Sequence, residues 1–153
     1  QMSTTAHVAD VPKCACSTLR KATRSVARIY DGRLARAGLT TTQFSILRAL
    51  ERHGRPVGLS RLAEELVMER TSLYRALEPL RRARLVAFTG SADKRAKEVT
   101  LTRWGEKKIA AALPHWREAQ EEFLAQFGRS AWSTLATQLG AIVQAAQAIP
   151  TAD

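Results

Sequence analysis

The spacing of apolar side chains along the chain predicts a series of amphipathic helices. From Cys14 to Arg36, apolar residues recur every three or four positions, which is the period of one buried helix face. Shorter stretches with the same period follow, and each predicts a helix. Their apolar positions are Phe44, Leu47 and Leu50, then Leu62, Ala63 and Leu66, and then Leu73, Ala76, Leu77 and Leu80.

Residues with strong preferences for helix ends mark the limits of these elements. Gly38 ends the first helix. The hydroxyls of residues 40–42 offer caps for the second helix, and Ser60 is expected to cap the third. Pro79 lies inside the fourth, where an interior proline costs about 3 kcal/mol. We therefore expect that helix to kink at Pro79 or to fray early.

The second half of the chain predicts a hairpin followed by two helices. Two short runs rich in β-branched and aromatic residues, at 85–88 and 98–101, flank a polar loop. Thr102 follows as the cap of a long helix, and Gly128 with Ser130 begins the last one. A tightly joined helix pair before a basic hairpin is the arrangement of a winged helix-turn-helix. The expected fold class is therefore mainly α with a small β-hairpin wing (α+β).

The predicted elements divide the chain into three parts. Residues 1–12 read as a flexible arm, residues 38–102 as the winged helix-turn-helix DNA-binding domain, and residues 13–37 and 103–149 as a helical dimerisation region. The long helices display more apolar stripe than the rest of the chain covers, so a second copy is the economical partner. The residues expected at this dimer interface are Leu19, Phe123, Phe127, Leu135, Leu139, Ile142 and Val143.

The charge of the chain indicates a nucleic-acid partner. The 153 residues carry a formal charge of +10, and 45% of them are hydrophobic, which is ample for a core. Residues 1–105 hold 20 basic and 9 acidic side chains, whereas residues 106–153 hold 4 and 5. The excess positive charge therefore belongs to the segment that contains the predicted DNA-binding domain.

Several other classes of protein do not fit the sequence. No apolar run approaches the length of about 20 residues that spans a bilayer, and no secretory core is present, so we expect a cytoplasmic protein without membrane contact. Two cysteines one residue apart and three scattered histidines predict neither a disulfide framework nor a metal site. No phosphate-binding glycine loop, nucleophile elbow or catalytic carboxylate pair is found, so neither an enzyme nor a cofactor is expected.

Two groups of residues together form a family signature. The hairpin region contributes Asp93-Lys94-Arg95, then Val99-Thr100-Leu101-Thr102 and Gly105. The preceding helices contribute Leu39-Thr40 with Gln43, Phe44 and Leu47, and the run from Leu62-Ala63 through Leu73, Leu77 and Leu80 to Leu85-Val86. In these residues the chain resembles the MarR family, the multiple-antibiotic-resistance regulators of bacteria, from about Cys14 to Ile149. The resemblance implies a triangular homodimer on a pseudo-palindromic operator, with the fourth helix in the major groove and the wing in the flanking minor groove.

The face of the fourth helix that meets DNA follows from its buried stripe. At 100° per residue, Thr71 and Arg75 point away from Leu73 and Leu77, and the first turns of such a helix read base edges. Arg75 suits bidentate contact with guanine. The DNA-binding residues expected from the helices are Ser60, Arg70, Thr71, Ser72, Tyr74 and Arg75. The alternative is a polar helix face that only meets solvent.

The hairpin loop supplies a second set of expected DNA contacts. Lys94 and Arg95 suit the narrow minor groove, where the negative potential attracts an inserted guanidinium. The resemblance implies that Asp93 braces the loop by pairing with an arginine. The alternative is an exposed turn of no consequence.

The resemblance also suggests a signal. Cys16, Tyr30 and Gln43 are spaced similarly to residues of the organic hydroperoxide resistance regulators in this family, although Thr41 stands where a second tyrosine is expected. This implies an oxidisable Cys16 thiolate with Tyr30 as its hydrogen-bonding partner, and a helix N-terminus among cations favours such a thiolate. A Cys14–Cys16 bridge within a helix is disfavoured, whereas pairing across subunits stays open. The alternative is an inert packed cysteine.

The more common mode in the family is the binding of a small, often aromatic and acidic, effector. The residues expected to line its pocket are Tyr30, Phe44, Trp104 and Trp116, whose alternative role is packing in the core. The expected function is thus a homodimeric sequence-specific repressor released from double-stranded DNA by such a ligand, with peroxide sensing through Cys16 as an alternative. A non-specific architectural or RNA-binding protein is the alternative of another class, which basicity alone permits.

Overall fold

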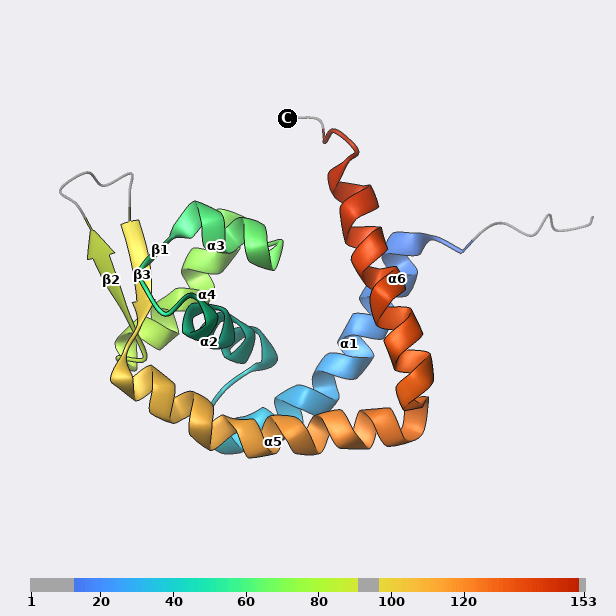
Figure 1. Cartoon of the computed structure of the whole chain (residues 1–153), viewed down its shortest axis with the longest axis horizontal. Helices are drawn as coiled ribbons and strands as arrows, with labels where there is room; N and C mark the ends of the chain where they lie inside the picture. Colours follow the sequence, from blue (N-terminus) through green and yellow to red (C-terminus); the bar gives the residue numbers. More distant parts are fainter. Residues whose placement is uncertain (1–12, 91–96, 152–153) are drawn as a thin grey trace, which may run out of the picture.

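The computed structural model describes residues 13–90 and 97–151, and these form helices and one small sheet. In Figure 1, α5 runs along the base of the molecule, the elements from α2 to β3 stand over its first half, and α6 rises from its far end. We call the elements from α2 to β3 the winged lobe. The elements in order are α1 (Ala15–Leu34), the short 3-10 helix η1 (Ala35–Ala37), α2 (Thr41–His53), β1 (Val57–Gly58), α3 (Leu59–Leu66), α4 (Arg70–Arg82), β2 (Val86–Gly90), β3 (Lys97–Leu101), α5 (Arg103–Phe127) and α6 (Arg129–Gln147).

The predicted fold class, mainly helical with a hairpin wing, is confirmed. Two of the helix starts have the hydroxyl caps that the sequence predicts. The Thr40 hydroxyl accepts a hydrogen bond from the Gln43 N–H at 3.2 Å, and the Gln43 side chain accepts one from the Thr40 N–H at 3.0 Å. This reciprocal pair is a capping box at the start of α2. The Thr102 hydroxyl likewise accepts from the Gly105 N–H at 3.1 Å and begins α5.

The start of α3 differs from the prediction. The helix begins at Leu59, and its N-cap is Gly58, which has no side chain that could accept a hydrogen bond. Val57 and Gly58 form β1, a two-residue strand that pairs with β3 and leads directly into α3. Burial of Leu59 and Val57, rather than a hydroxyl cap, positions this start. Ser60 is an exposed residue of the first turn, so its predicted capping role was wrong.

The winged lobe, the end of α1 and α5 share one hydrophobic core. Leu34 from α1, Leu47 from α2 and Leu77 from α4 are fully buried, and Ile109 from α5 is 2% exposed. The sheet is antiparallel in the order β1-β3-β2, so β3 is its central strand. The fully buried Val99 of β3 extends the core into the sheet. The hairpin and the helices of the lobe therefore pack as one unit.

Helix α4 continues past its internal proline to Arg82, so the expected early fraying was wrong. Leu77 and Leu80 lie on either side of Pro79 and are 0% and 2% exposed. Their burial outweighs the one hydrogen bond that proline does not donate. The Ala83 N–H donates to the Pro79 carbonyl at 3.0 Å, which closes the last turn.

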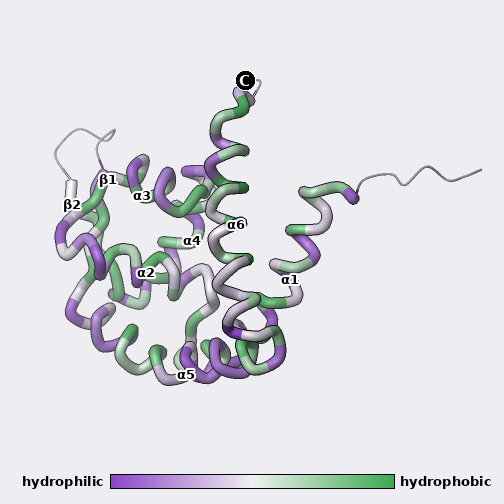
Figure 2. Tube along the Cα trace, turned by 45° about the vertical axis from the view of Figure 1, so that its right-hand side comes forward, coloured by the Kyte–Doolittle hydropathy of each residue, from purple (hydrophilic) through white to green (hydrophobic). Residues whose placement is uncertain are grey.

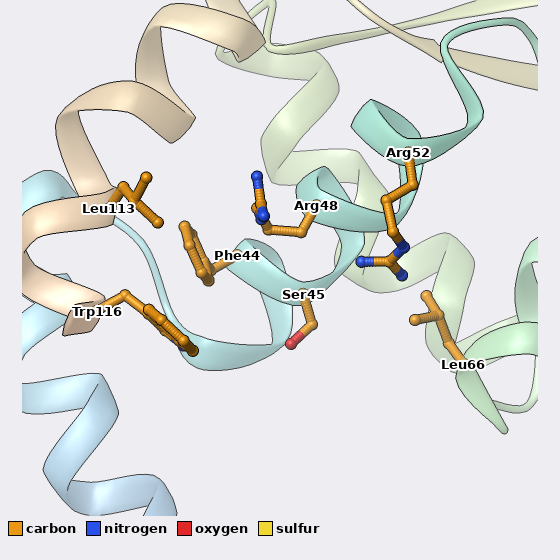
Figure 3. Close-up of a pocket in the computed structure, with 7 residues that line it drawn as sticks. All are labelled: Phe44, Ser45, Arg48, Arg52, Leu66, Leu113 and Trp116. Atoms are coloured by element: carbon orange, nitrogen blue, oxygen red, sulfur yellow. The ribbon is translucent and has the colours of Figure 1, made fainter. Parts of the chain in front are cut away.

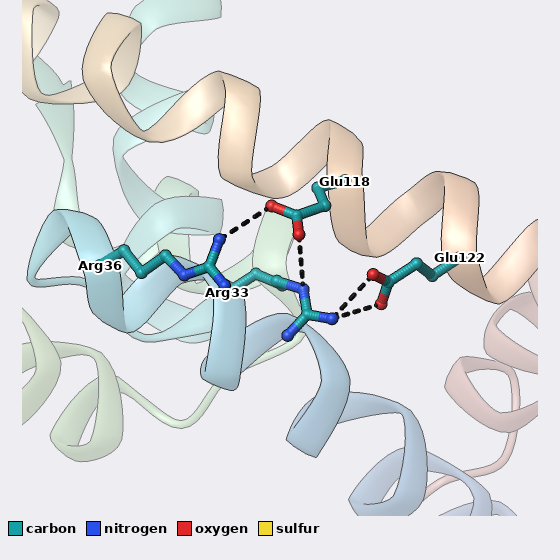
Figure 4. Close-up of polar contacts among 4 residues, drawn as sticks. All are labelled: Arg33, Arg36, Glu118 and Glu122. Atoms are coloured by element: carbon teal, nitrogen blue, oxygen red, sulfur yellow. Dashed lines mark hydrogen bonds and ion pairs between the residues drawn. The ribbon is translucent and has the colours of Figure 1, made fainter.

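A cluster of ion pairs joins α1 and η1 to α5 (Figure 4). The Arg33 guanidinium lies 2.7 Å from Glu122 and 3.2 Å from Glu118, and that of Arg36 lies 3.1 Å from Glu118. Hydrogen bonding to Glu122 is the main cause that raises the pKa of Arg33. Single exposed pairs stabilise little, but a carboxylate shared by two arginines restrains the crossing of α1 over α5.

The apolar side of α6 is left open in the chain. None of the side chains of α6 is buried, and Ile142 and Val143 are 43% and 40% exposed. Figure 2 shows hydrophobic residues along the whole helix. At the turn from α5 into α6, the Phe123 ring stacks on Phe127 and meets Trp132 edge-on. No helix within the described residues has both the length and the apolar character that crossing a membrane requires.

Candidate nucleic-acid interface

The first two turns of α4 present a polar surface. Leu73 and Leu77 are fully buried, which fixes the rotation of the helix about its own axis. Thr71 and Arg75 are consequently exposed on the opposite side. Arg70 and Ser72 in the first turn are exposed as well. Within residues 13–90 and 97–151, Arg75 has no acidic partner, so its guanidinium is available to an external ligand.

The second half of α4 is partly neutralised internally, because one glutamate pairs with two arginines. Glu78 lies 2.6 Å from Arg81 and 3.3 Å from Arg82, and all three residues belong to the same helix. The hydrogen bond from Arg81 is the first cause that lowers the pKa of Glu78 to about 2. Among the described residues, the two arginines of α4 without an acidic partner, Arg70 and Arg75, both lie in its first half.

The turn between α3 and α4 brings Ser60 close to the start of α4. Ser60 and Arg70 line the same open hollow, together with Gln147 at the end of α6. The turn passes through a left-handed conformation at Val67, where φ is 52°. A β-branched residue is strained there, so the burial of the helices on both sides must hold the turn.

Tyr74 differs from its neighbours on α4 because its ring packs within the protein. The ring stacks on Phe88 of β2 with 6.0 Å between the centroids, and the Lys97 ammonium of β3 lies 5.6 Å from the Tyr74 centroid. Tyr74 nevertheless remains 44% exposed. The sequence placed Tyr74 among the DNA contacts but gave no sign of this packing, because its partner follows fourteen residues later in another element.

The wing strands lead towards the predicted minor-groove residues. β2 and β3 pair without a break from Val86 opposite Leu101 to Gly90 opposite Lys97. Asp93, Lys94 and Arg95 follow Gly90 and lie outside the described residues.

The residues expected to sense peroxide do not meet within one chain. Cys14 and Cys16 are both exposed and unbridged. Tyr30 lies fourteen residues after Cys16 on α1, which is about 21 Å along a helix axis. The buried Tyr30 hydroxyl donates to Gln120, and burial raises the pKa of the phenol. The predicted contact between Cys16 and Tyr30 therefore does not form within one chain, and it stays a prediction that would need Tyr30 of a second copy.

Thr41, which stands in place of a second tyrosine, connects α1 to α2. Its hydroxyl donates to an oxygen of Asp31 at 2.6 Å, and its N–H donates to the same oxygen at 2.7 Å. Asp31 belongs to α1, so a carboxylate from one helix holds the first turn of the next.

A pocket of about 440 Å³ lies between α2, α5 and the end of α3 (Figure 3). The rings of Phe44 and Trp116 stack on one side of it with 6.3 Å between centroids. The guanidinium groups of Arg48 and Arg52 come from the next turns of α2. Its lining residues are Phe44, Ser45, Arg48, Arg52, Leu66, Leu113 and Trp116. Aromatic faces beside cations suit a small aromatic anion.

The structure places only part of the predicted pocket at this site. Phe44 and Trp116 line it, but Tyr30 does not. Trp104 does not line this pocket and is not in the core, because it is 55% exposed and its ring is flanked by Arg103 and Lys107.

Sequence reasoning missed the two arginines of the pocket. The four-residue step from Phe44 to Arg48 and Arg52 places all three on one helix face and could have identified them. Within the described residues, no group of histidine, cysteine or acidic side chains could hold a metal ion.

Comparisons with known proteins support a winged helix DNA-binding fold. Residues 39–105 match the model of a winged helix DNA-binding domain. The DNA complex of the Mycobacterium tuberculosis transcriptional regulator MosR is similar at a TM-score of 0.79 and 38% identity, over 89% of this chain and 98% of that one. Bordetella bronchiseptica BpsR, whose DNA binding is regulated by 6-hydroxynicotinic acid, gives a TM-score of 0.75 at 19% identity, over 86% and 95%. A comparison with curated proteins gave no match.

The fold and the exposed face of α4 define a winged helix DNA-binding protein. The chain belongs to the MarR family of transcription regulators, because its 38% identity to MosR extends over nearly the whole of that protein. The likeness to BpsR, at 19% identity, shows the fold alone. The expected family membership is confirmed, and the protein is a DNA-binding transcription regulator.

Proposed function

We propose that the protein is a homodimeric, sequence-specific repressor that reads its operator with the first half of α4. The observation that carries the proposal is the outward polar face of Thr71 and Arg75 above the fully buried Leu73 and Leu77. Arg75 is suited to guanine in the major groove, and Arg70, Ser72 and Ser60 to nearby phosphates. Lys94 and Arg95 of the wing take the flanking minor groove, with Asp93 bracing the loop.

A second copy covers the open helices in this proposal. The apolar side of α6, with Leu135, Leu139, Ile142 and Val143, joins Leu19 of α1 and Phe123 and Phe127 of α5 in the dimer interface. A dimer presents two copies of α4, whose spacing must match about 34 Å along B-DNA. Residues 13–37 and 103–149 thus act as the dimerisation region and residues 38–102 as the DNA-binding domain.

The pocket beside α2 is the proposed effector site. A small aromatic acid would place its ring against Phe44 and Trp116 and its carboxylate towards Arg48 and Arg52. Arg48 and Arg52 already pair with Glu51 and Glu65, so an acidic ligand competes with these carboxylates. Because α2 and α5 both line the pocket, occupation changes the angle between them and hence the spacing of the two recognition helices.

A gel-shift comparison tests sequence-specific binding. The promoter beside the protein's own gene and a random duplex of equal length are titrated at one fixed ionic strength. Repression through α4 predicts tight binding to the promoter, and Arg75→Ala should lose about 1 to 3 kcal/mol there with little change on the random duplex.

The matched control is Arg117→Ala, which removes another exposed arginine, from α5. Equal affinity for both duplexes would favour a non-specific nucleic-acid-binding protein, whose affinity is set by salt. A loss with Arg117→Ala as large as that with Arg75→Ala would contradict the role of α4.

A second candidate function is redox sensing through Cys16. The observation that favours it is that both thiols are exposed at the start of α1, within reach of an oxidant. Oxidation to a sulfenic acid, followed by pairing with a thiol, would then alter the dimer. An organic hydroperoxide should release the promoter from the native protein but not from Cys16→Ser. Unchanged binding of the oxidised native protein would exclude this function and leave the effector pocket as the sensor.

A further inference from the structure

Three side chains from three elements meet where the wing joins the recognition helix. Tyr74 of α4 stacks on Phe88 of β2 at 6.0 Å with an interplanar angle of 25°. The Lys97 ammonium of β3 lies 5.6 Å from the Tyr74 centroid and 6.0 Å from the Phe88 centroid. A cation within about 6 Å of two rings is attracted to both, so the contact joins all three elements. We call these three residues the wing-base cluster.

The register of the hairpin explains why this cluster forms. Phe88 is opposite Val99, and Gly90 is opposite Lys97, so all four residues point to the same face of the sheet. Val99 is fully buried, which identifies this face as the one turned towards α4. The Lys97 side chain lies over Phe88 on this face, with its ammonium 6.0 Å from the ring centroid. The cluster is therefore the outer edge of the core, at the end of the wing that leads to residues 91–96.

Tyr74 lies on a different side of α4 from the proposed base-reading arginine. Arg75 is rotated by about 100° from Tyr74 and is exposed without a partner in the described part of the chain. The Tyr74 ring, in contrast, is held against the wing. The same helical turn thus carries one side chain that is available to DNA and one that contacts the hairpin.

We propose that Tyr74 is a positioning residue that sets the direction of the wing relative to α4, so that the wing and the helix reach one duplex in register. The inference rests on the proposed function, in which α4 reads the major groove and the wing the flanking minor groove. Tyr74 then contributes to recognition through its ring and not through a contact of its hydroxyl with DNA. Loss of the ring leaves the bases read by Arg75 unaffected and weakens only the contribution of the wing.

The test compares two duplexes and three variants of the full-length protein. One duplex spans the whole footprint of the native protein on the promoter, and the other is trimmed to the segments under the two α4 helices. Tyr74→Leu should weaken binding to the full duplex by about two- to ten-fold, the range of an aromatic pair, and leave binding to the trimmed duplex unchanged. Phe88→Leu, on the wing side of the same contact, should behave alike, and Tyr74→Phe should bind as the native protein does.

A second measurement compares the affinity lost by the double variant with that lost by each single variant. A purely structural role would not change this comparison. The double variant Tyr74→Leu/Phe88→Leu should lose no more affinity than either single variant, because both remove one contact. Thermal unfolding of each variant shows that it remains folded at the temperature of the binding assay. A loss with Tyr74→Phe as large as with Tyr74→Leu would assign the hydroxyl to DNA and overturn the proposal, as would equal losses on both duplexes or no loss with Tyr74→Leu and Phe88→Leu.

Failure of the proposed function gives a different result. If the native protein binds the full and trimmed duplexes equally, the wing makes no contact with the flanks, whatever Tyr74 does. If Arg75→Ala binds the trimmed duplex as the native protein does, α4 does not read bases there. Either outcome concerns the native interface, whereas the wing-base cluster is judged by the Tyr74 and Phe88 variants.

Discussion

Gly105, at the scale of one residue, fixes the joint between the wing and α5. A Cβ atom at this position would lie 2.2 Å from the Leu85 carbonyl oxygen and 2.4 Å from the Leu101 side chain. The Leu85 oxygen cannot easily move, because it accepts hydrogen bonds from the N–H of Thr102 at 3.0 Å and from its hydroxyl at 3.0 Å. The backbone at Leu85 therefore leaves no room for a side chain at position 105.

We expect Gly105→Ala to lower the free energy of unfolding by about 1 to 3 kcal/mol, as overpacking does in other cores. Urea unfolding followed by circular dichroism measures the change. Gly32→Ala is the matched control, because nothing lies within 4 Å of its added Cβ on α1. That variant should gain about 0.5 to 1 kcal/mol from helix propensity. Equal stability of both variants would show that the backbone at Leu85 and the Leu101 side chain move aside for the added Cβ without cost.

Single residues were predictable where their partners are local in sequence. The caps at Thr40 and Thr102 act three residues away, so their chemistry can be read from the sequence. The packing of Tyr74 on Phe88 and the exposure of Trp104 depend on how separate elements meet. No sequence period reports such contacts, so these two side chains were assigned by type and not by environment.

At the scale of the element, the charges of α4 make a pH-dependent contribution. The arginines around Glu78 lower its pKa from 4.5 to about 2, so the ionised carboxylate is favoured in the folded protein. A carboxyl group with a lowered folded pKa stabilises the fold above its unfolded pKa, and this contribution is lost as the pH falls through the folded value. The relevant window therefore extends from about pH 4.5 down to about pH 2.

We expect Glu78→Gln to be less stable than the native protein at pH 7, with a difference that closes between about pH 4.5 and pH 2. Urea midpoints of both proteins across this range measure the difference. Glu64→Gln on α3 controls for removing one exposed carboxylate. A difference that stays constant down to pH 2 would mean that Glu78 acts through packing and not through its charge.

Elements were predicted well where a long period or a strong cap defines them. The helices and the hairpin repeat their pattern over many residues, whereas β1 has two residues and no period that a sequence can display. The prediction that α4 frays at Pro79 was wrong because it considered only the low helix propensity of proline. It left out the stabilisation from burying Leu77 and Leu80. Tertiary burial outweighed the local preference in this helix.

At the scale of the whole molecule, the open side of α6 makes a prediction about assembly. Ile142→Glu places a charge in the proposed dimer interface and should shift the protein towards monomer and weaken operator binding. Sedimentation equilibrium measures the first effect and gel shifts the second. Gln144→Glu, about 160° around the same helix, is the matched control and should remain dimeric. A native protein that sediments as a monomer at the concentrations used for DNA binding would contradict the dimer.

The sequence predicted the α4 face better than the pocket, because the pocket is built from several helices. The exposed polar face of α4 follows from one helix, so Thr71 and Arg75 could be placed on it from the sequence alone. The pocket is shared between α2, α3 and α5, and the sequence predicted only its Phe44 and Trp116. The four-residue step from Phe44 could have pointed to Arg48 and Arg52, but only the packing of the three helices shows that they share a pocket with Trp116.

The carboxylate of Asp31 bears on how a signal travels through the molecule. It accepts hydrogen bonds from both the N–H and the hydroxyl of Thr41. These two bonds fix the last turns of α1 to the first turn of α2. In the proposed dimer, a tilt of α1 at the subunit interface would be passed through these hydrogen bonds to α2, and from there to the lobe that holds α4. Asp31→Leu replaces the carboxylate with a side chain that accepts no hydrogen bond. In the proposed regulator, this variant should keep its affinity for DNA but no longer release DNA in response to the signal.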